Sequence, residues 1–287
     1  MTGPKVEKMS NKIAAIQMVS TKDVAVNLDQ AARLIAAAAM QGASLAVLPE
    51  NFALIESGQI RELAEEELAE GRLSGWLSAQ ARKHGIWLVA GSSPALIRPD
   101  GSKIDDGRVR SRLLVVDEKG EIVASYDKRH LFDVDVGDAL ASYRESARFE
   151  PGGDEVVVVD SPVGRIGLSI CYDLRFPGHY QRLRDLGADV LLVPAAFTKV
   201  TGEAHWEILL RARAIETQCY CVGAGQGGVH SPRRQTWGHS MIVDPWGEVL
   251  GCQDQGEGVV LAEVDLDKLK RLRAEMPVWQ HRRDSWA

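Results

Sequence analysis

The sequence predicts an α/β fold in which mixed β-sheets are covered by helices. Short apolar runs of strand length recur along the whole chain, and many are followed by segments with the apolar period of a helix. Short turn sequences also join neighbouring strands as hairpins, which argues against a purely parallel sheet. Hydrophobic residues make up 45% of the 287 residues, enough for a large core. Because no linker or low-complexity segment interrupts the chain, we expect a single domain over residues 1–287.

The first third of the chain alternates strands with helices. The apolar run 13–19 predicts a buried strand, and the helix after it should have Asn27 as its N-cap and Gly42 just past its last turn. A short strand should come next, then two helices, then another strand that ends at Gly91. The expected ranges are 44–48 and 86–90 for these strands and 60–70 and 73–84 for the helices.

The middle of the chain changes to a hairpin and a long loop. Residues 112–117 and 121–126 should pair across the turn at 118–120. An irregular stretch then extends through 127–153. A loop of that length without secondary structure of its own is usually functional.

The second half returns to strands and helices. Pro177 is well suited to the first position of a helix, and the Asp-Pro-Trp-Gly sequence at 244–247 is typical of a turn between two strands. Strands are expected at 156–159, 165–170, 190–194, 219–225, 237–243, 248–251 and 258–264, and helices at 177–186, 204–218 and 265–275.

Two strands in different halves of the chain resemble each other. Residues 45–50 and 190–195 each end near a proline, and each follows a helix end that contains Gly-Ala, at 42–43 and at 187–188. Two copies of a βα layer packed face to face would explain this similarity.

Composition and charge exclude several classes of protein. The formal net charge is −6, and no basic stripe interleaved with aromatic residues indicates a nucleic-acid surface. Residues 1–11 are polar, without the apolar segment of a signal peptide, and no apolar run is long enough to span a membrane. Four cysteines without a CxxC pair fit a reducing cytoplasm. The histidines show no metal-ligand spacing, so we expect neither a metal nor a cofactor.

A single thiol, Cys171, lies between a predicted strand and the helix that begins at Pro177. A strand-to-helix turn of this kind can present a nucleophile, although a lone cysteine is more often a small buried hydrophobe. A thiol that attacks a carbonyl or nitrile carbon needs a base and donors for the developing oxyanion. Glu50 and Lys128 each follow a predicted strand, and Glu145 lies in the long loop, yet each alone also has an ordinary surface interpretation.

Taken together, three motifs resemble the signatures of the nitrilase superfamily of carbon–nitrogen hydrolases, in its order and approximate spacing. They are PENF at 49–52, YDKRHLF at 126–132 and CYDLRFP at 171–177. Further stretches at 201–207, 211–218 and 237–247 resemble the amidase branch that acts on deaminated glutathione and related ω-amides. The resemblance extends from residue 13 to about residue 283 and implies a four-layer α-β-β-α sandwich of two mixed sheets.

The resemblance also implies a role for each motif residue. Cys171 is expected to be the nucleophile, Glu50 the general base and Lys128 the cation on the oxyanion side. Glu145 matches a second glutamate of the superfamily that helps to position the substrate amide, and the backbone N–H of Tyr172 would be the other oxyanion donor. The expected partners are a small amide substrate and water, and no cofactor.

Substrate contacts are predicted from the same motifs. Arg175 is a candidate to bind a substrate carboxylate, although a pair with Asp173 that holds the turn explains it equally well. Phe197 and Thr198 lie where the superfamily lines its pocket. Two departures bear on the pocket edge: Gly178 stands where the branch commonly has an acidic residue, and Arg110-Ser111 replaces a frequent asparagine-containing hairpin start.

The helix at 204–218 has two apolar stripes, one with Trp206 and one with Ile208 and Ile215. In the superfamily this helix usually lies at a dimer interface, so we expect a homodimer, with the tail 276–287 reaching across or along that interface.

Several alternatives remain open at this point. The substrate could be deaminated glutathione, a 2-oxo-acid ω-amide, an N-carbamoyl compound or a nitrile. A Cys–His hydrolase that pairs Cys171 with His205 or His239 is a different enzyme class. A catalytically silent binding protein on a hydrolase fold is a third class.

Overall fold

Two six-stranded mixed sheets form the centre of the protein in a computed structural model that describes residues 11–56, 58–138 and 140–283. The first sheet has the order β16 (Gly258–Glu263), β1 (Lys12–Gln17), β2 (Leu45–Val47), β3 (Trp87–Ala95), β4 (Arg110–Val116), β5 (Ile122–Asp127). The second has the order β15 (Val249–Gln253), β14 (Ser240–Val243), β11 (Tyr220–Gly225), β10 (Val190–Ala195), β9 (Gly164–Leu168), β8 (Val158–Ser161).

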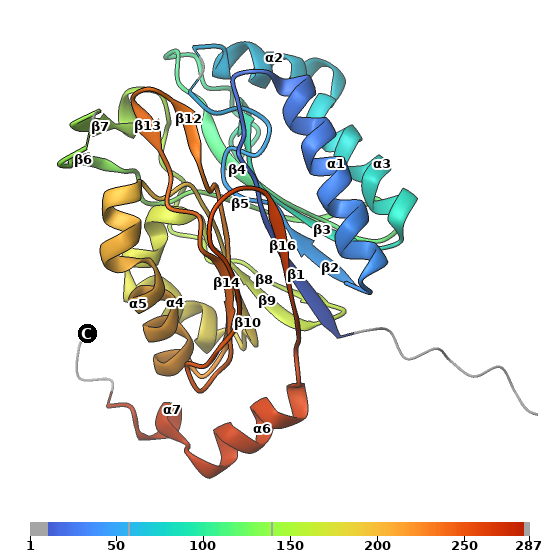
Figure 1. Ribbon diagram of the computed structural model, residues 1–287, viewed down its shortest axis with the longest axis vertical. Helices are drawn as coiled ribbons and strands as arrows, with labels where there is room; N and C mark the ends of the chain where they lie inside the picture. The colour runs from blue at the N-terminus through green and yellow to red at the C-terminus, as the bar shows by residue number, and fades with distance from the viewer. Residues whose placement is uncertain (1–10, 57, 139, 284–287) are drawn as a thin grey trace, which may run out of the picture.

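Helices cover the outer face of each sheet, so that the layers run α-β-β-α, as predicted (Figure 1). The first sheet is covered by α1 (Val24–Met40), α2 (Ile60–Glu70) and α3 (Arg72–His84). The second is covered by α4 (Pro177–Asp185) and α5 (Lys199–Thr217), and the chain ends with α6 (Leu266–Glu275) and α7 (Val278–His281).

The two sheets have the same pattern of parallel and antiparallel strands, which confirms the predicted similarity of the halves. In each sheet three central strands are parallel, in the order β1-β2-β3 and β9-β10-β11. An antiparallel strand flanks the first of them, and two successive antiparallel strands follow the third. Strands β2 and β10, which the sequence paired by their Gly-Ala and proline flanks, hold equivalent central positions.

Alternating residues of the first sheet supply two cores, because successive side chains of a strand point to opposite faces. On β1, Ile13 and Ala15 pack toward the second sheet, whereas Ala14 and Ile16 pack under the helices. The buried strands of the second sheet, such as β10, are apolar on both faces. This double burial explains why they are continuous apolar runs in the sequence.

Three predicted boundaries are wrong by four residues or more. Helix α1 begins one turn before Asn27, because Asp23 caps it by accepting hydrogen bonds from Ala25 and Val26, while Asn27 binds the loop backbone of Thr21. Strand β3 continues past Gly91 to Ala95. A side chain at Gly91 would collide with the backbone of Pro49, so the glycine permits close packing and does not end the strand.

The third concerns α5, which begins at Lys199 because Thr198 caps it. Secondary structure within the predicted loops was also missed. The stretch 127–153 contains a short hairpin, β6 (Asp133–Asp135) and β7 (Ser142–Arg144), followed by the 3₁₀ turn η1 (Glu145–Ala147). A second hairpin pairs β12 (Val229–Ser231) with β13 (Arg234–Gln235).

Candidate active site

Cys171 lies where β9 gives way to the 3₁₀ turn η2 (Cys171–Arg175), and α4 follows with Pro177 at its start. The backbone of Cys171 is in the left-handed region, with φ of 48°, which is uncommon for a residue with a side chain. Strained backbone of this kind persists only where the surroundings enforce it and is concentrated at functional sites. The predicted strand-to-helix turn at the thiol is therefore confirmed.

Asp173 holds this turn from within. Its buried carboxylate accepts hydrogen bonds from the backbone N–H of Ile170 at 2.9 Å and from the hydroxyl of Tyr126 at 2.8 Å. The backbone N–H and ring of His130 also contact it, at 3.0 and 2.7 Å. Asp173 is thus fully engaged, and the interpretation that it pairs with Arg175 is wrong.

Glu50 and Lys128 meet from two strands of the first sheet. Glu50 follows β2, and Lys128 follows β5. The Nζ of Lys128 lies 2.8 Å from Oε1 of Glu50, with the two side chains only 2% and 5% exposed. From the second sheet, Gln226 donates a hydrogen bond to the backbone carbonyl of Glu50 at 3.1 Å, which fixes the residue between the layers.

Glu145 completes the cluster from the long loop. Both of its carboxylate oxygens accept hydrogen bonds from Nζ of Lys128, at 2.7 and 2.9 Å. The backbone N–H of Phe132 also donates to Glu145, at 2.6 Å. One buried ammonium therefore lies between two carboxylates, an arrangement in which each ion compensates the desolvation of the others.

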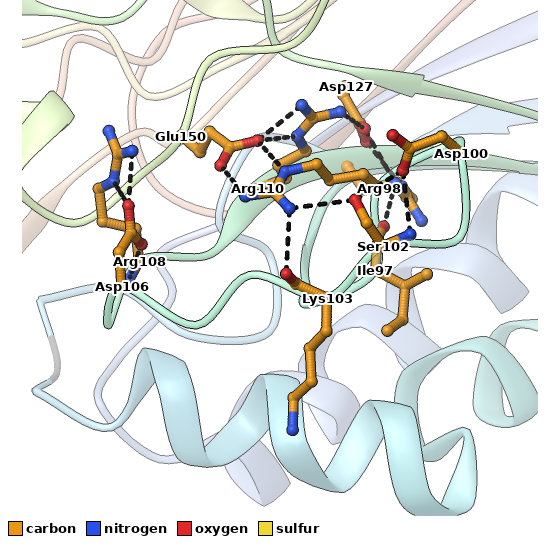
Figure 2. A network of polar contacts seen from close by, with 11 residues as sticks. Ile97, Arg98, Asp100, Ser102, Lys103, Asp106, Arg108, Arg110, Asp127 and Glu150 are labelled. Atoms are coloured by element: carbon orange, nitrogen blue, oxygen red, sulfur yellow. Dashed lines mark hydrogen bonds and ion pairs between the residues drawn. The ribbon is translucent and has the colours of Figure 1, made fainter.

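Strand β5, which ends just before Lys128, is anchored at Asp127 by an ion network (Figure 2). Arg110 donates to Asp127 at 3.0 Å and to Glu150 at 2.6 Å, and Arg112 donates to Asp127 at 2.6 Å. Arg98 closes the network by donating both to Glu150 and to the backbone carbonyl of Lys103. Arg110 therefore connects Asp127 with Glu150 next to Lys128, and its side chain does not line the cavity that contains Lys128.

The charges of this cluster set its protonation. Burial opposes the ammonium of Lys128, but Glu145 and Glu50 outweigh burial and hold the pKa of Lys128 well above its ordinary value. Burial, then the charge of Glu50, raises the pKa of the Cys171 thiol well above its ordinary value, only partly opposed by Lys128. Burial likewise raises the pKa of Glu145. A raised pKa favours the protonated form of the Cys171 thiol near neutral pH.

A cavity of about 230 Å³ opens in front of these groups. Cys171, Glu50, Lys128 and Glu145 all line it, so the structure brings together the four residues predicted to form the reaction centre. The other lining side chains include aromatic and aliphatic groups and three arginines: Leu54, Ile55, Ile60, Phe132, Leu140, Tyr143, Phe149, Arg144, Arg148 and Arg234.

A second, much smaller cavity lies on another side of the thiol. Tyr172, Arg175, Phe197 and Thr198 line it together with Cys171. All four predicted substrate-contact residues therefore lie beside the thiol but outside the larger cavity. The guanidinium of Arg175 lies 5.3 Å from the Phe197 ring centroid and 5.9 Å from that of Tyr172.

The sequence-based interpretation missed Tyr143 and Arg234. Tyr143 was passed over as part of an irregular loop, although it stands two residues before Glu145. Arg234 lies on β13, and the Ser-Pro sequence at 231–232 was the available turn signal for that hairpin.

Other sequence candidates lie away from the larger cavity. His205 contacts Arg175 at 3.3 Å, and His239 stacks on Trp237 with ring centroids 4.0 Å apart. Because neither histidine lines a cavity with Cys171, the Cys–His pairing has no geometric support. Gly178 is the second residue of α4, and an added Cβ at this position would meet open space.

Within residues 11–56, 58–138 and 140–283, no three His, Cys, Asp or Glu side chains are grouped so as to hold a metal ion. None of the helices in this described part combines the length and apolarity that crossing a bilayer requires.

Comparison with known proteins assigns this chain to a family. Residues 12–274 match the carbon–nitrogen hydrolase family. The chain belongs to the carbon–nitrogen hydrolase family. It is 42% identical over 271 residues to the deaminated glutathione amidase of Yersinia enterocolitica, a match that covers 94% of this chain and 92% of that one.

Solved structures agree. The NitFhit protein of C. elegans superposes with a TM-score of 0.85 at 40% identity, covering 95% of this chain. This chain spans only 65% of that protein's length. Nit3 of Saccharomyces cerevisiae, described as a member of branch 10 of the nitrilase superfamily, superposes with a TM-score of 0.81 at 28% identity, covering 96% of this chain and 98% of that one.

These matches confirm the nitrilase-superfamily fold that the motifs predicted. This carbon–nitrogen hydrolase is an amidase. It hydrolyses a carbon–nitrogen bond of a small molecule, and that bond is not a peptide bond.

Proposed function

We propose that this carbon–nitrogen hydrolase cleaves deaminated glutathione through a thioester on Cys171. The bond that breaks is the amide bond that joins the acyl group to cysteinylglycine. The proposal is supported by one observation above the others: the ammonium of Lys128 lies between Glu50 and Glu145 in the wall of the cavity that also contains the thiol. The relative from Yersinia enterocolitica, similar over nearly its whole length, is named for that substrate.

In the acylation step, Glu50 accepts the thiol proton as the sulfur of Cys171 forms a bond to the amide carbon. A thiol with a raised pKa needs such a base at the moment of attack, because little thiolate exists beforehand. The carbonyl π-electrons move to oxygen, and Lys128 and the backbone N–H of Tyr172 stabilise that oxyanion. The first N–H groups of a helical turn have no partner within the turn, which leaves Tyr172 able to donate.

In the second half of acylation, the oxyanion collapses and the carbon–nitrogen bond breaks. The proton held by Glu50 passes to the nitrogen, and the amine leaves as cysteinylglycine. Glu145 keeps Lys128 in place by accepting two of its hydrogen bonds and helps to position the substrate amide.

Deacylation repeats the chemistry with water. Glu50 takes a proton from water as the oxygen attacks the thioester carbon, and the same two donors stabilise the new oxyanion. The carbon–sulfur bond then breaks, Cys171 regains its proton from Glu50, and the acid product leaves.

Other carbon–nitrogen substrates would use the same groups. The runner-up is an ω-amide of a 2-oxo acid, which would release ammonia, followed by N-carbamoyl compounds and nitriles. The deciding experiment measures cysteinylglycine from deaminated glutathione and ammonia from the other three classes, at equal enzyme concentration. If kcat/KM for any of the other classes exceeds that for deaminated glutathione, the substrate assignment is wrong and the amidase assignment stands.

A catalytically silent binding protein is the alternative of another class. Mass spectrometry of enzyme quenched during turnover should detect an acyl adduct on Cys171. If no substrate of the panel is consumed and no adduct forms, the silent protein is the better description.

We also propose a cytoplasmic homodimer that forms through the outer face of α5. The stripe with Trp206 is buried against the sheet, whereas Ile208 and Ile215 of the other stripe are 69% and 47% exposed. In the tail, Trp279 hydrogen-bonds to Asp185 at the end of α4, whereas the predicted contribution of Trp286 lies outside the described residues. Analytical ultracentrifugation of wild type and of Ile208→Glu should show a dimer and a weakened dimer, and a wild-type monomer would overturn the proposal.

A further inference from the structure

We propose that Arg234 binds a carboxylate of the substrate and thereby selects anionic amides over neutral ones. The inference rests on the proposed amidase function and adds to it the residue that recognises the end of the substrate remote from the scissile bond.

Arg234 reaches the larger cavity from a part of the chain that supplies none of the proposed reacting groups. It lies on β13, in the hairpin with β12 that stands next to the β6–β7 hairpin (Figure 1). Its guanidinium carbon lies 5.8 Å from the ring centroid of Tyr143 on β7. Both side chains line the same cavity as Cys171. The two hairpins therefore form a wall of the cavity and hold the arginine against an aromatic face.

Unlike Lys128 and Arg144, Arg234 has no carboxylate partner among the described residues. Lys128 is held by Glu50 and Glu145, and Arg144 forms an ion pair with Asp135 at 2.9 Å. Among the described residues no carboxylate oxygen lies within 4.0 Å of the Arg234 guanidinium nitrogens. Its Nε is buried and has no hydrogen-bond partner in that part of the chain.

A buried N–H of a charged group that lacks an acceptor is costly, because its hydration is lost without replacement. Such groups in native structures are few, and each calls for an explanation. A carboxylate placed in the cavity would accept from Nε and a terminal nitrogen together, in the bidentate geometry that guanidinium groups favour.

The charge around the cavity also favours an anion. Away from the cluster of Lys128 with its two glutamates, the charged lining residues are Arg144, Arg148, Arg234 and a single acid, Glu56. Because Arg144 is already paired with Asp135, we assign the attraction for a carboxylate there to Arg234, whereas the acidic reaction centre would repel it. Deaminated glutathione has a carboxylate at each end, so the proposed substrate meets this requirement.

The kinetic test compares two amides of equal length that differ in one group. Glutaramate, the monoamide of glutaric acid, has a terminal carboxylate where pentanamide has a methyl group. Arg234→Ala should raise KM for glutaramate and for deaminated glutathione at least about tenfold, the effect of losing a charge-assisted hydrogen bond, while kcat changes by less than about threefold. The kcat/KM for pentanamide should stay within about threefold.

Arg233→Ala is the matched control, because Arg233 is the exposed neighbour in the same hairpin turn and does not line the cavity. It should leave all three substrates unchanged. Arg234→Lys keeps the charge but not the fork of donors, so it should recover only part of the affinity for glutaramate. Equal KM values for glutaramate in wild type and Arg234→Ala would overturn the proposal and leave the amidase function intact.

A binding measurement separates the proposal from the amidase function. Calorimetry of glutarate, a dicarboxylate, against Cys171→Ala should show binding that falls at least about tenfold when Arg234→Ala is added. If wild type hydrolyses no amide but glutarate binding still depends on Arg234, the proposed function fails and the carboxylate site stands. If glutarate binds equally well without Arg234, the carboxylate site fails whatever the activity.

Discussion

The carboxylate of Asp173 contacts His130 twice, accepting from its backbone N–H at 3.0 Å and lying 2.7 Å from its ring Nδ1. Asp173 stands two residues after Cys171, and His130 stands two residues after Lys128. This one contact therefore connects the turn that presents the thiol with the segment that presents the ammonium, across the interface between the two sheets.

Asp173→Asn should destabilise the protein by about 3 kcal/mol at pH 7. The carboxylate oxygens of Asp173 accept all of its side-chain hydrogen bonds, whereas the amide nitrogen of an asparagine is itself a donor and would leave some of these donors without an acceptor. Burial opposes the charge of Asp173, but hydrogen bonds, that from His130 first, lower its pKa below the ordinary value. A lowered folded-state pKa gives stability that is present above the unfolded-state pKa of 3.8 and is lost as the pH falls through the folded value. The difference in free energy of unfolding between wild type and Asp173→Asn, measured by urea unfolding, should therefore become smaller below about pH 4.

The control for Asp173→Asn is Asp160→Asn on the exposed end of β8, which should change stability by less than about 0.5 kcal/mol. Equal stability of Asp173→Asn and wild type at pH 7 would show that the contact with His130 does not support the turn.

Cys171→Ala should abolish amide hydrolysis while the melting temperature stays close to that of wild type. The thiol is only 8% exposed but borders a cavity, so loss of one sulfur removes little packing. Ammonia or cysteinylglycine release by the purified variant measures the effect. Cys252→Ala, which removes an exposed thiol, is the matched control and should be fully active. Residual turnover by Cys171→Ala would rule out the thioester mechanism.

Glu50→Gln should lower kcat by about 10²- to 10⁴-fold, the usual contribution of a general base, with a smaller effect on KM. The amide cannot accept the thiol proton, although it preserves the size of the side chain. Steady-state kinetics on the preferred amide provide the measurement. Glu70→Gln at the exposed end of α2 should behave as wild type. A kcat unchanged in Glu50→Gln would transfer the role of base to another group.

Lys128→Met should lower kcat by about 10²- to 10³-fold, because the oxyanion loses its cationic donor. It should also lower the melting temperature, since Glu50 and Glu145 would face each other in a buried site without a cation between them. Lys119→Met in the exposed β4–β5 turn is the control for both measurements. Wild-type kcat in Lys128→Met would remove Lys128 from the oxyanion side.

The alkylation rate of Cys171 should rise from pH 7 to pH 9.5 without reaching a plateau. Burial, then the charge of Glu50, raises the pKa of this thiol well above its ordinary value, so the thiolate fraction is still growing at the upper end of that range. Iodoacetamide labelling followed by site-resolved mass spectrometry measures the rate. A plateau below pH 7 would show a preformed thiolate, and the proposed role of Glu50 as base toward the thiol would then be wrong.

Much of the fold could be predicted from the sequence, because its signals are local. Continuous apolar runs marked the buried strands, and Pro177 marked the start of α4. The similarity of residues 45–50 and 190–195 anticipated two sheets with the same pattern of parallel and antiparallel strands. The N-cap of α1 was misplaced because Asp23 and Asn27 are both good caps, and only the loop contacts of Asn27 decide between them.

The site was predictable only in part. Glu50, Lys128 and Cys171 stand in recognisable motifs, and Glu145 followed from the resemblance to the superfamily, but the partner of Asp173 depends on a contact between sheets. Arg234 could not be identified from its sequence context, because an arginine in a short hairpin is ordinarily solvated. Its significance depends on which groups the fold leaves without a partner.

The face-to-face arrangement of the sheets has a consequence for where the chemistry resides. Glu50 and Lys128 extend from the first sheet and Cys171 from the second, so a fragment that comprises either half alone would hold an incomplete set of reacting groups. Enzymatic activity therefore reports on the interface between the two sheets. Any treatment that separates the sheets should abolish turnover before the helices unfold.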